Sequence, residues 1–185
     1  MAANHAAHSL SQTADEILRF RAEALALEVA DEGVSDLLSL LLFRIGEEWY
    51  AVILDDVREI FQEYQVTTSP CVPDFILGVV NVRGEILSVT DPARLMHIGT
   101  IEVGEGVQPP AIVLTDGDIA TAIVVDEIGD ITDVAREAIE PPVSIIDRAQ
   151  AEFVAGSVFV NGTMVGLINV ERVLQPIGGS GKHDR

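Results

Sequence analysis

Two stretches of the chain repeat one another, and this internal duplication constrains the fold more than any other feature. Gly46–Ile60 aligns with Gly117–Ile131, and the glycine, one alanine, one aspartate and the final isoleucine coincide. Phe75–Gly84 aligns with Phe153–Gly162, with Phe, Gly, Val, Val and Gly at matched positions. The second pair is offset by a few residues more than the first, so the second copy carries an insertion between its two blocks. The aligned blocks define a repeat of about seventy residues.

Each copy is expected to hold a hairpin, a short acidic turn, a glycine-bounded hairpin and a helical turn. A unit of that size buries too little apolar surface to be stable alone, so the copies are expected to form two similar small barrels that share an interface. The alternative is chance similarity, because any hairpin needs glycine in its turn and valine in its strands. The matched Phe-x-x-Gly-x-Val-x-Val-x-Gly spacing favours duplication.

Short β-rich segments separated by turn residues predict an all-β fold. Strands are expected at Leu38–Ile45 and Trp49–Leu54 in the first copy, and at Ala111–Thr115 and Ile119–Val125 in the second. Valine and isoleucine are abundant while aromatic residues make up only 5% of the chain, which is typical of packed β structure.

Three helical segments are predicted beside these strands. Residues 11–32 carry a capping pattern and a broad apolar stripe, so this helix is expected to pack on its own domain or to dock on another protein. Asp91 and Asn169 are capping residues placed to open short helices at Ala93–Met96 and Val170–Gln175.

This order of elements divides the chain into three regions. An N-terminal extension with the amphipathic helix is predicted at 1–36, and the duplicated β domain at 37–176. A flexible tail is predicted at 177–185, because its glycines and polar residues have nothing to bury.

The charge of the chain excludes some partners. Thirty acidic residues face eleven basic ones, for a formal net charge of −19, which repels nucleic acid and anionic lipid. Solubility explains such a charge, and the choice of a basic partner is the alternative interpretation. No apolar run is long enough to insert into a membrane, and no secretory signal is expected at the N-terminus. Cys71 is the only cysteine, which fits the reducing cytoplasm.

No set of residues predicts an enzyme, a cofactor or a metal site. None of the four histidines has a second His or Cys at metal-ligand spacing: His5, His8, His97 and His183. Cys71 has no neighbouring histidine to activate it as a nucleophile. The run Gly179–Lys182 lacks the Ser or Thr and the following helix of a phosphate-binding loop.

The turn at Arg83 and Gly84 is the most unusual polar feature. Gly84 is expected to take the positive-φ position of a tight turn, which places Arg83 beside it at the tip. The second copy has Asn161-Gly162 there, an ordinary hairpin turn. Arg83 is therefore either a plain surface arginine or a charged anchor that pairs with Glu59 or with a carboxylate of a partner.

These residues resemble the CheW family, the coupling proteins of bacterial chemotaxis. Phe43–Val52 is similar to the family's opening hairpin, and Val57-Arg-Glu-Ile60 to its V-x-E-I segment. Gly78-Val-Val-Asn-Val-Arg-Gly-Glu-Ile-Leu-Ser-Val-Thr-Asp91 resembles the motif G-V-x-N-L-R-G-x-I-x-P-V-x-D-L, the most specific stretch. Ile123–Ile128 and Phe153–Gly156, with Met164–Leu174, resemble the second half of the family. The resemblance covers residues 38–176.

The resemblance implies two SH3-like five-stranded β-barrel subdomains with a hydrophobic groove between them. It also implies binding to the cytoplasmic tip of methyl-accepting chemotaxis receptors and to the regulatory domain of the histidine kinase CheA. Such a protein works in the cytoplasm, recruited to receptor arrays at the membrane.

On matching positions, the resemblance implies partner contacts at Val57, Glu59, Arg83 and Ile86, with Asn81 and Gly84 shaping the turn. The chain departs from the family at Ser88, at Pro92 and at Glu85, where a charge replaces an apolar or neutral residue. These departures are expected to shift partner choice without disturbing the fold.

The resulting hypothesis is an adaptor that acts by protein–protein contact. A stand-alone regulatory module that binds a peptide or small ligand in the inter-barrel groove is the second hypothesis. An enzyme of another type is the third, and the lack of convergent polar groups disfavours it.

Overall fold

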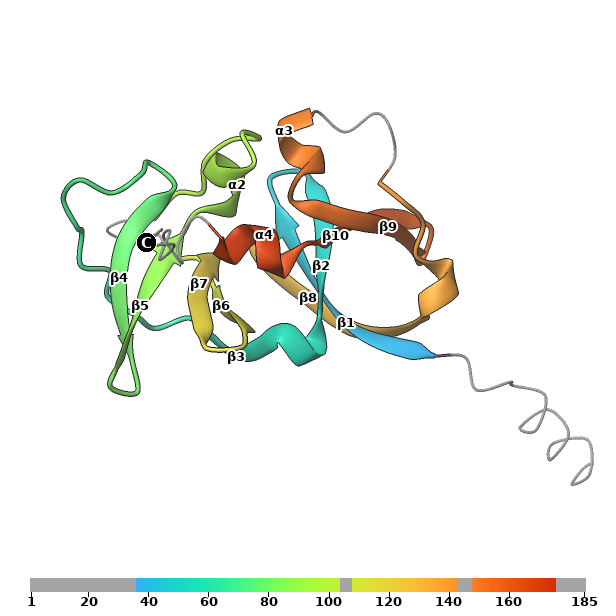
Figure 1. The fold of residues 1–185 in the computed structure, drawn as a ribbon, viewed down its shortest axis with the longest axis horizontal. Helices are drawn as coiled ribbons and strands as arrows, with labels where there is room; N and C mark the ends of the chain where they lie inside the picture. The colour runs from blue at the N-terminus through green and yellow to red at the C-terminus, as the bar shows by residue number, and fades with distance from the viewer. Residues whose placement is uncertain (1–35, 104–107, 143–147, 176–185) are drawn as a thin grey trace, which may run out of the picture. The chain divides into compact units, whose positions relative to one another are not determined.

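The computed structural model describes residues 36–103, 108–142 and 148–175 (Figure 1). The predicted helix at 11–32 and the predicted tail at 177–185 lie outside these residues. The unit that begins at Leu37 is built on two five-stranded sheets, here called sheet A and sheet B. The all-β class and its two five-stranded units are confirmed.

The strands of each sheet alternate between distant parts of the chain. Sheet A runs, in spatial order, β8 (Glu127–Ala135), β1 (Leu37–Ile45), β2 (Glu48–Ile53), β10 (Thr163–Ile168) and β9 (Val154–Val160). Sheet B runs β3 (Val57–Phe61), β6 (Ala111–Asp116), β7 (Ile119–Val124), β5 (Glu85–Thr90) and β4 (Ile76–Val82).

The two copies of the repeat exchange their first hairpins. The β1–β2 hairpin of the first copy lies in sheet A with β8, β9 and β10 of the second copy. The β6–β7 hairpin of the second copy lies in sheet B with β3, β4 and β5 of the first. A parallel pair joins the copies in each sheet, β2 with β10 and β5 with β7, and all other pairings between strands are antiparallel. The sequence pattern predicts two barrels but not this exchange, because equivalent hairpins present the same edges.

The predicted acidic turns after the first hairpins are longer elements than expected. In the first copy a single 3₁₀ turn, η1 (Leu54–Asp56), lies before β3. In the second copy β8 comes directly after the hairpin, and η2 (Arg136–Ala138) follows it. Strands β3 and β8 lie at sheet edges and hold no fully buried residue, which is why their sequences are more polar than those of the central strands.

The matched glycines of the Phe-x-x-Gly pattern are required by close backbone contacts. Gly78 on β4 lies against the backbone of Thr67, and Gly156 on β9 lies against that of Glu140. A Cβ at either position would clash with the facing carbonyl group. The contact pairs Thr67 with β4 in sheet B and Glu140 with β9 in sheet A. Only glycine leaves room for the backbone to approach this closely.

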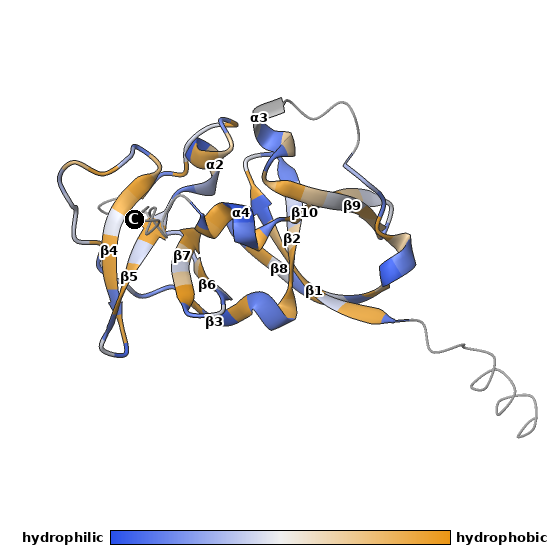
Figure 2. Ribbon diagram, in the orientation of Figure 1, coloured by the Kyte–Doolittle hydropathy of each residue, from blue (hydrophilic) through white to orange (hydrophobic). Residues whose placement is uncertain are grey.

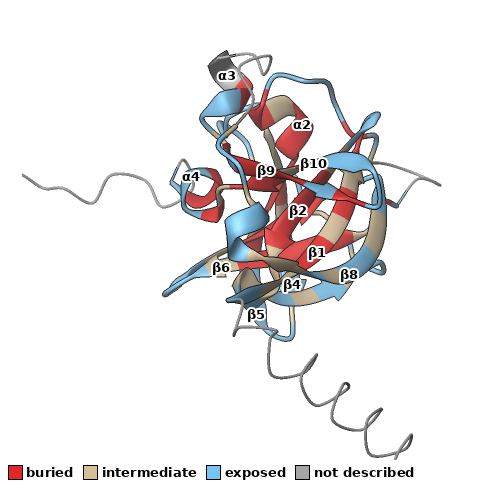
Figure 3. Ribbon diagram, turned by 90° about the vertical axis from the view of Figure 1, so that its right-hand side faces the viewer, coloured by how far each residue is buried: buried red, intermediate tan, exposed pale blue. Residues whose placement is uncertain are grey.

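One hydrophobic core joins the two sheets, as the shared interface predicted (Figure 3). The strands that supply this core are rich in hydrophobic residues (Figure 2). Helix α4 (Val170–Leu174) follows β10 of sheet A and packs on β6 and β7 of sheet B. The largest members of this core are fully buried: Leu41, Phe43, Val52, Val89, Met96, Ile112, Leu114, Ile123 and Leu174. A smaller cluster, which includes Leu40, Val158 and Leu167, fills sheet A alone.

Both predicted capping residues cap a helix. The Asp91 carboxylate accepts hydrogen bonds from the N–H groups of Ala93 and Arg94 and opens α2 (Pro92–Leu95). Asn169 accepts one from the N–H of Arg172 and opens α4. Pro92 stands at the first helical position, where its missing N–H costs nothing. The short helix α3 (Arg148–Ala151) was not predicted.

Candidate protein-docking surfaces

The β4–β5 turn has the geometry that its sequence predicts. Its two central residues, Arg83 and Gly84, have φ of 53° and 91°. The N–H of Gly84 donates to Asn81 Oδ1 at 2.8 Å, so the asparagine fixes the turn. Asn161 and Gly162 adopt the same conformation in the second copy, with φ of 51° and 81°. Asparagine tolerates this left-handed conformation much better than arginine, so the first copy holds Arg83 in a strained position.

Arg83 reaches from this turn to the opposite edge strand of sheet B. Its Nε lies 3.2 Å from Glu59 Oε2 on β3. The Glu59 side chain is 22% exposed and that of Arg83 is 85% exposed. The structure therefore pairs Arg83 with Glu59, as one of the two interpretations predicted, while most of the guanidinium group remains open to solvent.

Two residues that sequence reasoning did not select extend this pair into a network. Arg58 Nη1 lies 2.9 Å from Glu85 Oε2, and Arg58 Nε lies 3.9 Å from Glu59 Oε1. The four charged side chains and Val82 line a hollow at the tip of the β4–β5 hairpin. The signal for Glu85 was present, as a charge where the family has an apolar or neutral residue, but nothing in the sequence pointed to Arg58.

The predicted contact residues separate into an exposed group and a packed one. Ile86 lies opposite Asn81 in the β4–β5 register and is exposed beside the Arg83 turn. Val57 is half-buried and packs against the hydrophobic core from β3. Ile86 therefore adds apolar surface to the charged network, whereas Val57 supports the strand that carries Glu59.

A second exposed surface lies at the equivalent hairpin of sheet A. Phe159 on β9 and Met164 on β10 are directly opposite each other in the antiparallel register. They are 68% and 49% exposed. Nothing in the sequence marked these two residues as exposed, although the repeat aligns Phe159 with Asn81 and Met164 with Ile86.

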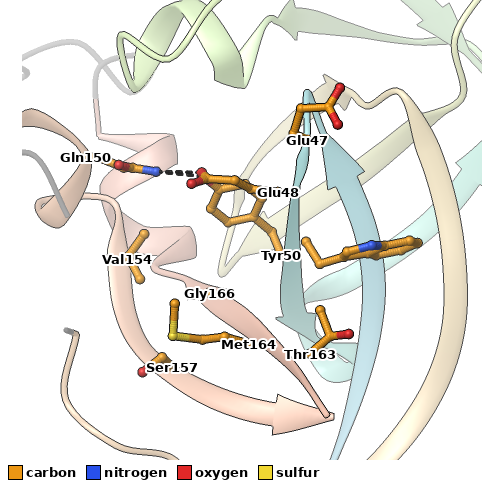
Figure 4. Close-up of a pocket in the computed structure, with 10 residues that line it drawn as sticks. Glu47, Glu48, Tyr50, Gln150, Val154, Ser157, Thr163, Met164 and Gly166 are labelled. Atoms are coloured by element: carbon orange, nitrogen blue, oxygen red, sulfur yellow. Dashed lines mark hydrogen bonds between the residues drawn. The ribbon is translucent and has the colours of Figure 1, made fainter. Parts of the chain in front are cut away.

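A hollow beside Met164 is lined by residues of β2, β9, β10 and α3 (Figure 4). The hydroxyl of Tyr50 donates to Glu48 Oε2 at 2.6 Å, and Gln150 Nε2 donates to the same hydroxyl at 2.7 Å. Burial and the adjacent Glu48 carboxylate raise the pKa of Tyr50 above its ordinary value, so the phenol stays protonated. Gly166 lies against the Tyr50 ring, where a Cβ would be 3.1 Å from the ring.

Within the described residues, no group of three or more His, Cys, Asp or Glu side chains is arranged to hold a metal ion. No helix of that part of the chain is long and apolar enough to cross a bilayer. Cys71 lies exposed in a loop.

Two five-stranded sheets share one core, and each presents an exposed hairpin. These features define a scaffold for protein–protein contact. A family described as the CheW-like domain matches residues 39–177. The chain therefore belongs to the CheW-like domain family, which confirms the resemblance seen in the sequence.

Individual relatives agree with this assignment. The chain is 30% identical to the chemotaxis protein CheW of Rhizobium meliloti, over 72% of this chain and 85% of the relative. It is 31% identical to the chemotaxis protein CheW of Klebsiella aerogenes, over 72% of this chain and 80% of the relative. A solved structure, the scaffolding protein TtCheW from Thermoanaerobacter tengcongensis, matches with a TM-score of 0.63 at 27% identity, over 71% of this chain and 88% of the other.

Proposed function

We propose that this chain is a chemotaxis-type adaptor that couples methyl-accepting receptors to the histidine kinase CheA. Membership of the CheW-like family supports this role, since relatives are named chemotaxis proteins and a related structure is named a scaffolding protein. At the level of the family the role is non-catalytic. In this proposal the chain works in the cytoplasm at receptor arrays, where it holds a receptor tip against the regulatory domain of the kinase.

The presentation of Arg83 is the observation that carries the proposal. A non-glycine residue in a left-handed conformation costs on the order of 1 kcal/mol, and the neighbouring structure must hold it there. Asn81 holds the turn and Glu59 holds the guanidinium group through Nε. The planar fork of the same group suits a carboxylate, so we assign its Nη atoms to a carboxylate of the partner, with Ile86 as the adjoining apolar contact.

The mechanism is geometric. Because one core joins the two sheets, a movement imposed at the Arg83 turn is transmitted to the rest of the unit as a rigid body. A receptor that changes conformation then favours one state of a bound kinase domain over another, without any chemical step on the adaptor.

The test is binding of the full chain to a receptor cytoplasmic fragment and to the CheA regulatory domain. We expect Arg83→Ala to lose binding to one of them while its circular dichroism spectrum stays that of the parent chain. Arg83→Lys keeps the charge and loses the fork, so it is expected to recover only part of the affinity. Arg44→Ala is the matched control, because Arg44 also forms an exposed ion pair, with Glu127 on sheet A at 3.0 Å.

Unchanged binding by Arg83→Ala would remove the assigned surface. Failure of the parent chain to bind either protein would contradict the adaptor role and favour the stand-alone module that binds a peptide or small ligand.

A further inference from the structure

The β9–β10 hairpin carries an exposed apolar pair that the fold does not use. Phe159 is the most exposed of the large apolar side chains in the described residues. Directly opposed residues of an antiparallel pair extend on the same side of the sheet, so Phe159 and Met164 form one apolar step. Exposed aromatic and methionine side chains grouped in this way are typical of contact surfaces.

The duplication shows that turn or strand chemistry does not require this pair. Asn81 and Ile86 hold the equivalent positions in the first copy, in the same register. There the asparagine bonds the turn through Gly84. In the second copy Asn161 occupies the turn itself, so Phe159 is free of any role in its geometry.

The hollow next to Met164 places acidic side chains beside the apolar pair of Phe159 and Met164. The Tyr50 ring and Gly166 lie at its centre, and Val154, Ser157 and Gln150 line the side formed by β9 and α3 (Figure 4). Glu47 lies in the β1–β2 turn and Glu48 begins β2, and both residues are exposed. The Glu48 carboxylate accepts hydrogen bonds from the Tyr50 hydroxyl and from Gln150 Nε2 across the hollow (Figure 4). A hollow bordered by two carboxylates favours a cation through Coulomb attraction.

The charge and the exposed apolar pair together limit which kind of partner can bind at this hairpin. A second copy of the chain would bring Glu47 and Glu48 against another acidic surface, with a net charge of −19 on each molecule. A partner with a lysine or arginine next to aliphatic residues complements both the carboxylates and the apolar step.

We propose that Phe159, Met164 and the hollow bounded by Glu47 and Glu48 form a second docking surface, which takes a basic side chain flanked by apolar residues on a partner protein. This surface is opposite in charge preference to the Arg83 turn, which takes a carboxylate. That the two surfaces serve two partners of one adaptor rests on the proposed function, whereas the charge preference of the second surface does not.

The charge preference is tested on the full chain with two small probes of equal length, n-hexylammonium and n-hexanoate. We expect hexylammonium to shift the methyl resonance of Met164 and the amide resonance of Gly166, with hexanoate shifting them much less. Glu48→Gln is expected to weaken the hexylammonium shifts. Equal shifts by both probes, or none by either, would overturn the proposal whatever the chain binds in the cell.

The docking role is tested with Phe159→Ser and Met164→Gln. Both side chains are exposed, so folding should be little affected. Ile131→Ser is the matched control, because Ile131 is an equally exposed apolar residue on β8, at the other edge of sheet A. We expect each variant to lose roughly tenfold in affinity for either the receptor fragment or the CheA regulatory domain, the size of a contact-centre truncation. The partner affected should differ from the one that Arg83→Ala affects.

Full binding of both proteins by the Phe159 and Met164 variants would overturn the docking role while leaving the proposed function standing. If the parent chain binds neither protein, the proposed function fails and the probe experiment still decides the charge preference of the surface.

Discussion

Asp91 and Asn169 occupy the same position in the two copies, yet removing their side chains should have very different effects on stability. Asp91 is fully buried. Its Oδ1 accepts from the N–H groups of Ala93 and Arg94 at 2.9 and 3.2 Å, and its Oδ2 accepts from that of Ile101 at 3.0 Å. Arg94 Nε lies 3.2 Å from the same Oδ2, as an ion pair without hydrogen-bond alignment.

The cost of Asp91→Ala follows from these contacts. Loss of a helix cap costs about 1 kcal/mol. The N–H of Ile101, next to a buried side chain, loses a charged acceptor and is left unpaired, which costs about 1–3 kcal/mol more. We therefore expect a loss of at least about 3 kcal/mol in the free energy of unfolding, since Asp91→Ala also leaves the buried Nε of Arg94 without its counter-charge. Asn169→Ala removes one cap bond, from the Arg172 N–H, and should cost about 1 kcal/mol.

Urea unfolding of both variants measures the difference, with the midpoint and the slope fitted separately. The loss of unfolding free energy in Asp91→Asn should fall between those of Asp91→Ala and Asn169→Ala, because asparagine keeps a capping oxygen but turns an amide toward the Ile101 N–H. Equal costs for Asp91→Ala and Asn169→Ala would refute the claim that the link to Ile101 makes Asp91 the stronger anchor.

Three further predictions concern Arg83 in the β4–β5 turn, Gly78 on β4 and Asp56 in η1. Arg83→Asn should raise the free energy of unfolding by about 0.5–1 kcal/mol by relieving the left-handed conformation, while it reduces partner binding; a loss of stability in urea unfolding would show that the turn is not strained. Gly78→Ala should cost about 2–3 kcal/mol in the same assay, because its Cβ clashes with the Thr67 carbonyl, and a neutral effect would contradict the close contact. Burial, then Asp116 and Asp55, raise the pKa of Asp56 in the folded chain, so the folded state binds its proton more tightly than the unfolded state does. Stability from Asp56 is therefore present below its unfolded pKa and lost as pH rises through the folded value. Asp56→Asn should raise the melting temperature at pH 7 and not near pH 3, and an equal rise at both would refute this assignment.

The sequence was sufficient for the parts of the fold that depend on local chemistry. The hairpins, the Asp91 and Asn169 caps and the positive φ of Gly84 each follow from local residue chemistry. Asp and Asn oxygens accept from the free N–H groups that open a helix, and glycine takes a positive φ without a steric cost. The partnership of the strands was not predictable in this way. Since the two copies offer equivalent hairpin edges, only the packing of the whole unit decides which copy each hairpin joins.

The residues of the candidate docking surfaces divide in the same way, into those that local sequence marks and those that only the folded unit brings together. Arg83, Asn81 and Glu59 stood out because a motif and a turn marked them, and the structure brings them together. Arg58 did not, because its pairing with Glu85 depends on how sheet B closes. Phe159 and Met164 read as ordinary strand residues, since alternation alone does not say which face of an edge hairpin is left uncovered.

The exchange of hairpins has a consequence for how the chain is made. Strand β1 leaves the ribosome early, but its neighbour β8 is far along the chain, as the bond of 2.6 Å from Ser39 Oγ to Asp133 Oδ1 illustrates across 94 positions. Neither half of the gene encodes a complete sheet, so a product truncated between the copies would expose unpaired strand edges. We expect such fragments to aggregate when made separately and to recover a native spectrum only when both halves are produced together.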